Sequence, residues 1–140
     1  MSIMFRPEIH ALLRFDSQYD SLCQADQQGL EEEDKGRALL CAACRHLVTR
    51  SNEKIDVHGK HAHVFFNPAG IVFELGCFRE APGCTFLGRP TLEFTWFDGY
   101  AWRVCLCSRC RTHLGWQYGN VHGPGQFYGL ILSQLIAGQG

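Results

Sequence analysis

The sequence predicts an all-β domain that holds one metal ion. Two observations carry this prediction: about eight short strand-like segments separated by turn residues, and two Cys-x-x-Cys pairs far apart in the chain. The 140 residues suffice for one domain with a single modest core. A hydrophobic content of 46% with 19% charged residues is typical of a globular chain and not of a disordered one.

Charge and hydropathy argue against several functional classes. The formal net charge of −1 does not suit a protein that binds nucleic acid through its phosphates. No apolar run approaches the roughly 20 residues that span a bilayer, so no membrane association is expected. The first ten residues lack a basic region followed by an apolar core, which argues against a secretory signal. We therefore expect a cytoplasmic protein in a reducing compartment, where structural disulfides are rare.

Residues 1–37 differ in character from residues 38–140, which we take as the folded domain. Apolar side chains recur near helical spacing between Ile9 and Leu22, and a proline precedes them at a position suited to a first helical turn. The segment then becomes polar and ends in the acidic run Glu31–Asp34. We interpret it as an amphipathic helical extension with a solvated linker, which packs on the domain or a second copy, or else recruits a partner.

The chain beyond residue 40 alternates short strand-like segments with turn residues. Glycine, proline or aspartate stands in most of the gaps, and no long helical period is present. The segment Phe127–Ile136 fits either a strand or a helix, and periodicity does not separate the two. The expected strands are Ile55–Val57, His63–Phe66, Ile71–Leu75, Thr85–Leu87, Leu92–Phe97, Ala101–Leu106, His113–Tyr118 and Phe127–Leu132.

The two Cys-x-x-Cys pairs predict a metal centre. Each such turn places two thiolates about one tetrahedral edge apart, so Cys41 and Cys44 together with Cys107 and Cys110 complete a four-cysteine site. Four thiolates leave no position for water, so we expect one structural Zn²⁺ that links the two turns. A thioredoxin-like redox pair would need a βαβ context, which this strand-rich sequence does not offer.

The remaining cysteines and a histidine cluster have simpler interpretations. Cys77 and Cys84 flank a Pro-Gly turn and would form a pair under oxidation. Otherwise, we expect four cysteines to be small buried apolar residues: Cys23, Cys77, Cys84 and Cys105. Three histidines surround an expected turn and are interpreted as exposed, with a second metal site as the alternative: His58, His61 and His63.

All three tryptophans lie between Trp96 and Trp116, around the second cysteine pair. Trp96 and Trp102 flank an Asp-Gly turn and can approach each other across a hairpin. Strand periodicity places Trp116 and Tyr118 on one face. A single tryptophan is most often a core residue. Three that converge beside a metal turn favour a flat-walled pocket for a planar ligand.

A longer pattern contains these residues. Trp-Phe-x-Gly-Tyr-x-Trp-x4-Cys-x2-Cys-x2-His-x-Gly-Trp-x-Tyr runs from Trp96 to Tyr118. Matching motifs lie before it, at the first cysteine pair, Asn67–Gly70 and Leu87–Pro90, and after it, at Phe127–Leu130. Together they resemble the CULT family, the thalidomide-binding domain of cereblon, and most closely its bacterial single-domain members. The resemblance covers about residues 38–132 and leaves the N-terminal stretch unexplained.

The resemblance implies a β-tent, in which two antiparallel four-stranded sheets meet at an angle and the zinc site pins them near the apex. It also implies an aromatic cage for a glutarimide or a related cyclic imide. Phe94 stands where cereblon has histidine, and its backbone would accept from the imide N–H while the backbone of Trp96 donates to an imide carbonyl. Tyr118 would form the base, a position that is phenylalanine in cereblon. The implied ligand-binding residues are Asn67, at the rim, with Phe94, Trp96, Trp102, Trp116 and Tyr118.

The expected function is therefore a non-catalytic binding module. Its expected ligands are glutarimide- or thalidomide-type imides, uracil- or uridine-like molecules, or proteins that carry a C-terminal cyclic imide. Indole faces cover a neutral ring, while strand backbone meets the donor–acceptor edge of an imide. The ubiquitin-ligase role of cereblon is not carried over, because the sequence shows none of the additional domains on which that role depends.

Three alternatives stay open at this point. The same aromatic residues would suit a methylated ammonium ion, although Glu93 and Asp98 have no assured direction toward the pocket. A B-type methionine sulfoxide reductase shares the tent-like fold, but it needs a reactive cysteine, and only Cys105 and His113 offer reactive groups nearby. A Yippee-like structural domain would share the zinc site and the tent without needing three converging tryptophans.

Overall fold

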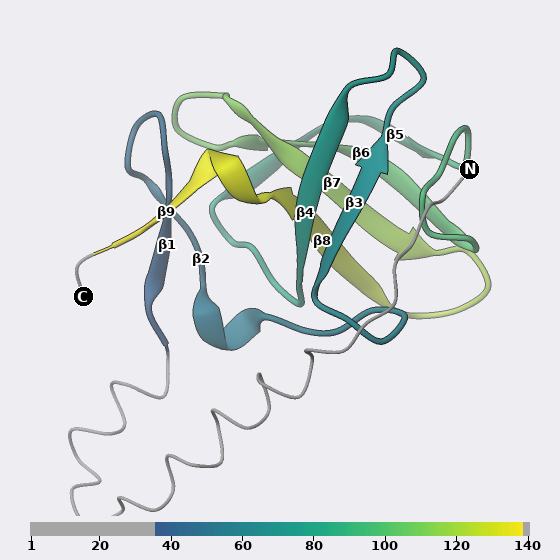
Figure 1. The fold of residues 1–140 in the computed structure, drawn as a ribbon, viewed down its shortest axis with the longest axis horizontal. Helices are drawn as coiled ribbons and strands as arrows, with labels where there is room; N and C mark the ends of the chain where they lie inside the picture. Colours follow the sequence, from purple (N-terminus) through teal and green to yellow (C-terminus); the bar gives the residue numbers. More distant parts are fainter. Residues whose placement is uncertain (1–35, 139–140) are drawn as a thin grey trace, which may run out of the picture.

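The computed structural model describes residues 36–138 and shows two antiparallel sheets (Figure 1). The smaller sheet has three strands in the order β2-β1-β9, and the larger has six in the order β3-β4-β8-β7-β6-β5. The predicted all-β fold with two antiparallel sheets is confirmed, and it is consistent with a β-tent. The strands divide three and six instead of four and four. The expected helical extension, residues 1–37, lies outside the described residues except for its last two positions.

The described residues contain nine strands with short connections. Two short 3-10 segments, η2 (Ser51–Glu53) and η3 (Leu132–Gln134), interrupt them. Within this part of the chain, no helix has the length and apolar character that a bilayer crossing requires. The strands are β1 (Ala38–Cys41), β2 (Leu47–Arg50), β3 (Ala62–Phe66), β4 (Val72–Phe78), β5 (Cys84–Thr91), β6 (Tyr100–Cys107), β7 (His113–Asn120), β8 (Gln126–Ile131) and β9 (Leu135–Ala137).

The central strand β8 explains the unequal division of strands. Both of its edges are hydrogen-bonded, to β4 on one side and to β7 on the other. Its side chains alternate between two buried faces, with Tyr128 and Leu130 in one hydrophobic cluster and Phe127 and Ile131 in another. Because β8 is satisfied on both edges and both faces, the six strands form one continuous sheet.

The larger sheet separates two hydrophobic clusters. The first lies between the sheets and includes the cysteines Cys41 and Cys107 with Val48 and Phe78. The second contains no residue of the smaller sheet, and its members are mostly aromatic: Phe65, Leu75, Cys77, Trp96, Phe97, Tyr118, Phe127 and Ile131. Each face of the larger sheet therefore has a core of its own.

Two of the segments predicted as strands do not form strands in the structure. The segment Ile55–Val57 contributes only an isolated bridge between Val57 and Lys60. The segment Leu92–Phe97 forms an irregular turn instead of a strand. The hydroxyl of Thr95 donates to the carbonyl of Tyr100 at 2.7 Å, which draws the turn together. Such side-chain bonds to nearby backbone compete with strand pairing.

The smaller sheet is built from segments that the sequence does not predict as strands. β1 and β2 flank the first cysteine pair, and the ambiguous segment Phe127–Ile136 divides into β8, η3 and the start of β9. Each strand of this sheet has only three or four residues. That length is too short for an alternating pattern to be recognised.

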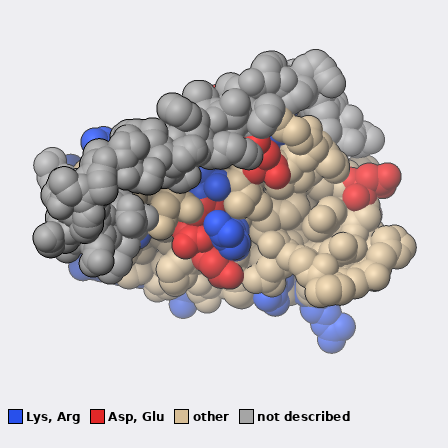
Figure 2. Space-filling view, turned by 90° about the horizontal axis from the view of Figure 1, so that it is seen from below, with Lys and Arg blue, Asp and Glu red and all other residues tan. Residues whose placement is uncertain are grey.

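Charged side chains of both signs are interspersed on the surface. In the view of Figure 2, lysine or arginine side chains lie next to aspartate or glutamate side chains near the middle of the face, beside broad areas of other residues. Residues 36–140 carry ten basic and six acidic residues, whereas residues 1–35 carry three basic and eight acidic ones. The two parts of the chain therefore have opposite net charge.

Candidate functional site

Four cysteines contributed by both sheets lie together. Cys41 ends β1 and Cys44 lies in the turn after it, while Cys107 ends β6 and Cys110 lies in the turn after that strand. Their Sγ atoms all lie within 4.8 Å of one another. The Cys41–Cys110 and Cys44–Cys107 sulfur pairs are each 3.7 Å apart. Thiolates bound to zinc at 2.3 Å in a tetrahedron stand about 3.8 Å apart. The four cysteines are therefore close enough to bind one metal ion.

The two cysteine turns have the same backbone geometry. The N–H of Arg45 donates to the carbonyl of Cys41 at 2.7 Å, and the N–H of Arg111 donates to that of Cys107 at 2.8 Å. Both arginines adopt the left-handed backbone conformation, with φ of 67° and 66°. A contact of 3.0 Å between the Ser108 hydroxyl and a ring nitrogen of His46 links the turns directly. This matched geometry brings the four sulfurs together.

The thiols differ in how readily they lose a proton. A hydrogen bond from the Thr112 hydroxyl, with the Sγ–Oγ1 distance at 3.1 Å, lowers the pKa of Cys110 to about 6. Desolvation raises the pKa of Cys44 to about 11. A coordinated metal overrides the raised pKa of Cys44, because a thiol that coordinates a metal is deprotonated. Metal binding therefore releases protons at this site, and its affinity rises with pH.

The histidine cluster does not form a second metal site. Among residues 36–138, the four cysteines are the only group of three or more suitable side chains close enough to share an ion. The ring nitrogens of His61 and His63 lie within hydrogen-bond distance of backbone carbonyls instead. His58 is exposed as expected, but His63 is only 1% exposed, so its interpretation as an exposed turn residue is wrong.

The other described cysteines are structural. Cys77 and Cys105 are fully buried, as predicted, whereas Cys84 is partly exposed. Cys77 belongs to the aromatic cluster and Cys84 packs against the cluster between the sheets, so the proposed oxidised pair is not supported. The strand β4 carries Cys77 to the opposite face of the larger sheet. Cys23 lies outside the described residues.

A cavity of about 290 Å³ lies beside the aromatic cluster. Trp102 and Tyr118 are direct cross-strand partners on β6 and β7, and Trp116, two residues before Tyr118, lies on the same face of β7. Trp96 comes from the connection between β5 and β6. The cavity is lined by the six residues implied by the resemblance and by one proline: Asn67, Pro68, Phe94, Trp96, Trp102, Trp116 and Tyr118.

Hydrogen bonds and ring contacts hold the indoles in place. The indole N–H of Trp96 donates to the carbonyl of Phe66 at 3.1 Å, and that of Trp102 donates to the carbonyl of Glu93 at 2.9 Å. The rings of Trp96 and Trp116 meet edge to face, with centroids 5.1 Å apart. Because the ring edges are fixed in this way, the indoles are preorganised to cover a planar ligand.

A β-bulge decides which face of β7 presents Trp116. The pairing of β6 with β7 shifts at Leu114, which becomes the extra residue. Leu114 therefore packs between the sheets while Trp116 packs against the aromatic cluster, although residues two apart share a face in a regular strand. Gly115 is required here, because a Cβ atom would lie 2.2 Å from the carbonyl oxygen of Gly129.

The edge of the cavity carries backbone groups that no described residue satisfies. The carbonyl of Phe94 and the N–H of Trp96 make no hydrogen bond within residues 36–138. Phe94 has a φ of 56°, in the left-handed region, and its side chain is 58% exposed. A bulky residue rarely adopts this conformation, and such strain is concentrated at functional sites.

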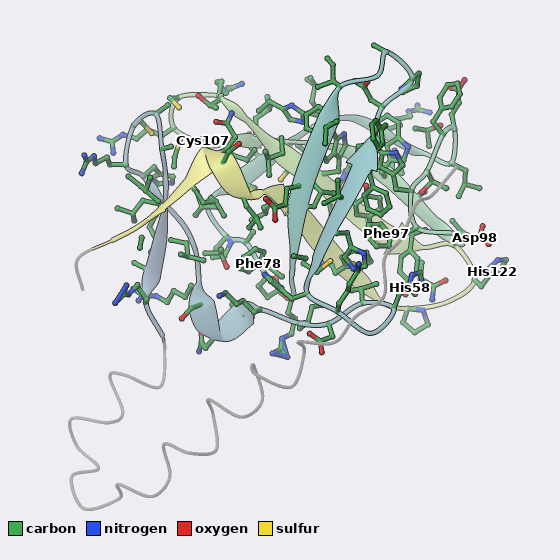
Figure 3. The ribbon with its side chains drawn as sticks, in the orientation of Figure 1. His58, Phe78, Phe97, Asp98, Cys107 and His122 are labelled. Atoms are coloured by element: carbon green, nitrogen blue, oxygen red, sulfur yellow. The ribbon has the colours of Figure 1, made fainter. Side chains whose placement is uncertain are left out.

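Among the described residues, 36–138, no carboxylate lines the cavity. Glu93 and Asp98 are both exposed. Figure 3 shows Asp98 at the outer end of its loop, with its side chain directed away from the body of the sheet. The cavity therefore has no counter-charge for a cation, and its walls suit a neutral ring.

The sequence leads us to expect that the aromatic cavity and the cysteine site lie side by side. In the structure they are separated. Trp102 is near the start of β6 and Cys107 ends it, so their backbones are separated by about 17 Å at 3.3 Å per residue. They also face opposite sides of the larger sheet. Figure 3 shows Cys107 and Phe97 toward opposite ends of the molecule. The β6–β7 hairpin nevertheless connects the two features.

Together these features define a class: a small two-sheet β-domain with a four-cysteine metal site and an aromatic cavity. No family model matches the chain. It is similar to cereblon of Danio rerio, with 33% identity over 113 residues that cover 76% of this chain and 26% of the relative. Cereblon of Gallus gallus is 32% identical over 113 residues, covering 76% of this chain and 25% of the relative. Cereblon of Drosophila melanogaster is 32% identical over 103 residues, covering 70% and 17%.

The similarity supports a cereblon-like domain of the CULT type, which confirms the sequence-based resemblance at that level. The chain spans about a quarter or less of the length of these relatives. What the relatives do as whole proteins is therefore a separate question from what this domain does.

Proposed function

We propose that this protein is a non-catalytic module that binds neutral cyclic imides in the aromatic cavity. The observation that carries the proposal is the combination of three tryptophans around one cavity with a carbonyl and an N–H at its edge that no residue among 36–138 pairs. An imide presents one N–H donor between two carbonyl acceptors. The carbonyl of Phe94 would accept from that donor, and the N–H of Trp96 would donate to one of the acceptors.

The proposed ligands share this edge and a compact ring. They are glutarimides such as thalidomide, uracil- or uridine-like molecules, and proteins with a C-terminal cyclic imide. Ligand cavities range upward from about 300 Å³, so one ring with an exposed substituent suits a cavity of about 290 Å³. The side-chain oxygen of Asn67 already accepts from the N–H groups of Ala69 and Ile71. Its amide group would therefore meet the substituent as a donor.

We further propose that the metal is one structural Zn²⁺ held by Cys41, Cys44, Cys107 and Cys110. Sulfur separations of 3.7 Å match a tetrahedral four-thiolate zinc site. Such an ion supplies no chemistry to a ligand but joins β1 of the smaller sheet to β6 of the larger. These residues would orient the β6–β7 hairpin on which Trp102, Trp116 and Tyr118 stand.

Two alternatives receive less support from the site. A methylated ammonium ligand would have aromatic walls but no carboxylate in the cavity. A reductase would need an accessible thiolate, whereas Cys105 is fully buried and its thiol pKa is raised by a hydrogen bond with Cys84 and by burial. We therefore assign no catalytic role. We propose a cytoplasmic protein of the bacterial type, and we carry over no assembly partner of cereblon.

Tryptophan fluorescence tests the proposal. Titration with glutarimide and with uridine should quench emission saturably, whereas N-methylglutarimide, which lacks the imide donor, should bind at least about tenfold more weakly for the loss of one buried hydrogen bond. Tetramethylammonium serves as the probe for the cation alternative. Quenching by the cation alone, or none by any probe in folded, zinc-loaded protein, would overturn the imide assignment.

A matched pair of variants locates the binding site. Trp102→Ala should abolish imide binding and leave the zinc content at one per chain, because Trp102 faces away from the cysteine site. Phe86→Ala serves as the control, since Phe86 packs against the cluster on the opposite face and should leave affinity unchanged. Retained affinity in Trp102→Ala would place the site elsewhere.

A further inference from the structure

A groove separate from the aromatic cavity lies between β2 and the turn that joins β4 to β5. Its volume is about 390 Å³. Leu47 is 37% exposed there, and the Thr49 hydroxyl already donates to the carbonyl of Glu80 at 2.7 Å. The groove therefore offers a ligand mainly apolar surface and few polar groups that lack a partner among the described residues. Its lining residues are Leu47, Thr49, Arg50, Glu53, Glu80 and Pro82.

Backbone contacts hold the two walls of the groove together. The N–H of Gly83 donates to the carbonyl of Val48 at 3.1 Å, and the carbonyl of Gly83 accepts from the N–H of Ser108 at 2.9 Å. A Cβ atom on Gly83 would lie only 2.1 Å from the carbonyl oxygen of Leu47. Only a glycine permits this approach, so the walls are fixed before anything binds. A preformed groove reduces the entropy that docking would cost.

The described chain begins at the rim of this groove. The guanidinium of Arg50, a lining residue, donates to the carbonyl of Gly36 at 3.4 Å. The N–H of Arg37 donates to the Ser51 hydroxyl at 2.8 Å. The first 35 residues therefore leave the domain beside the groove. From Leu22 to Gly36, the chain can span up to about 46 Å when extended, which is ample for an earlier segment to reach the groove.

The sequence of the first 35 residues complements the domain in two ways. Its net charge is −5, against +4 for residues 36–140. The groove lining itself is of mixed charge, with Arg50 beside Glu53 and Glu80. Arg79, next to the lining, pairs with Glu53 at 3.5 Å. The segment also carries an apolar series at near-helical spacing: Ile9, Leu12, Leu13, Phe15, Tyr19 and Leu22.

We propose that the groove between β2 and the β4–β5 turn is the docking site for residues 9–22 of the same chain. The apolar series lies against the apolar part of the groove, and the opposite net charges of the two parts of the chain favour their contact. Tethering strengthens this contact, because a covalent linker sets an effective concentration on the order of millimolar, at which a weak contact is populated. The N-terminal segment thereby covers the domain on the side of the smaller sheet.

Carbene footprinting of the full chain tests the proposal. Leu12→Asp/Leu13→Asp removes apolar side chains from the series, and Ser17→Asp/Ser21→Asp adds the same charge outside it. Labelling of the peptides that contain residues 47–53 and 80–83 should rise at least about twofold in the first variant, as expected when a populated intramolecular contact is lost. The second variant should match the wild type. Leu47→Glu should raise labelling of residues 9–22 by a similar factor.

Two outcomes would overturn the proposal. Equal labelling of the groove in the wild type and in Leu12→Asp/Leu13→Asp means that the segment does not cover it. Protection that disappears on dilution of the protein means that the segment binds a second copy and not its own chain. Circular dichroism of each variant confirms that the domain is folded. Imide titration is a separate measurement, so failure of the docking leaves the ligand proposal intact.

Discussion

Gly115 on β7 is a position where one added methyl group should cost a large part of the stability. A Cβ atom there would lie 2.2 Å from the carbonyl oxygen of Gly129 and 2.8 Å from Cα of Leu130. Both atoms belong to the backbone of β8 and cannot rotate away, so β7 and β8 must separate locally. Overpacking costs about 1–3 kcal/mol and a lost ladder hydrogen bond about 1 kcal/mol. We therefore expect Gly115→Ala to lower the free energy of unfolding by about 2–4 kcal/mol.

Gly119→Ala on the same strand is the matched control. A Cβ atom at Gly119 meets nothing within 4 Å, so the free energy of unfolding should change by no more than about 0.5 kcal/mol. Urea unfolding of the zinc-loaded protein, followed by tryptophan fluorescence, measures both variants. Because the bulge at Leu114, next to Gly115, positions Trp116, Gly115→Ala should also weaken glutarimide binding. Equal unfolding midpoints and slopes for the two variants would refute the reasoning.

Three further predictions concern titration, metal and strain. Burial lowers the pKa of His63 to about 4, below the value near 6.5 in the unfolded chain. The unfolded state then binds the extra proton, so about 2 kcal/mol of stability should be lost between pH 7.5 and pH 5. His63→Gln should lack that part of the pH dependence in urea unfolding, and an unchanged pH profile would contradict the assignment. Cys107→Ser should remove zinc and the cooperative thermal transition, whereas Cys84→Ser should keep both; an intact transition in Cys107→Ser would argue against a structural ion. Phe94→Gly should stabilise the fold by up to about 1 kcal/mol by relieving the left-handed φ, and a lower thermal midpoint would show that the Phe94 side chain contributes packing instead.

The metal site is the part of the protein that local sequence predicts best. If two cysteines separated by two residues share an ion, the chain between them must form a tight turn with both sulfurs on one side. The structure brings Cys41 and Cys44 together with Cys107 and Cys110, as that spacing predicts. The alternation of β6 and β7 likewise predicts that Trp116 and Tyr118 share a face.

Other features depend on contacts that no local pattern records. The segment Leu92–Phe97 has the composition of a strand, yet the Thr95 hydroxyl draws it into a turn by binding the carbonyl of Tyr100. His63 lies beside an expected turn and is predicted to be exposed, yet its ring stacks on Phe65 and is buried. In both cases the deciding partner is a tertiary or side-chain contact and not the local periodicity.

The sequence by itself determined the all-β class and the spacing of four cysteines that suits one metal ion, because both depend on short-range spacing and residue type. The residues that line the aromatic cavity came from the resemblance to a known family. Tertiary structure decided how these parts are arranged. The double pairing of β8 joined six strands into one sheet, and the bulge at Leu114 turned Trp116 toward the face opposite the cysteines. Backbone pairing and close approach set those relations, and they involve residues distant in the chain. The cavity and the metal site therefore occupy different faces and ends of one hairpin, although the sequence places their residues side by side.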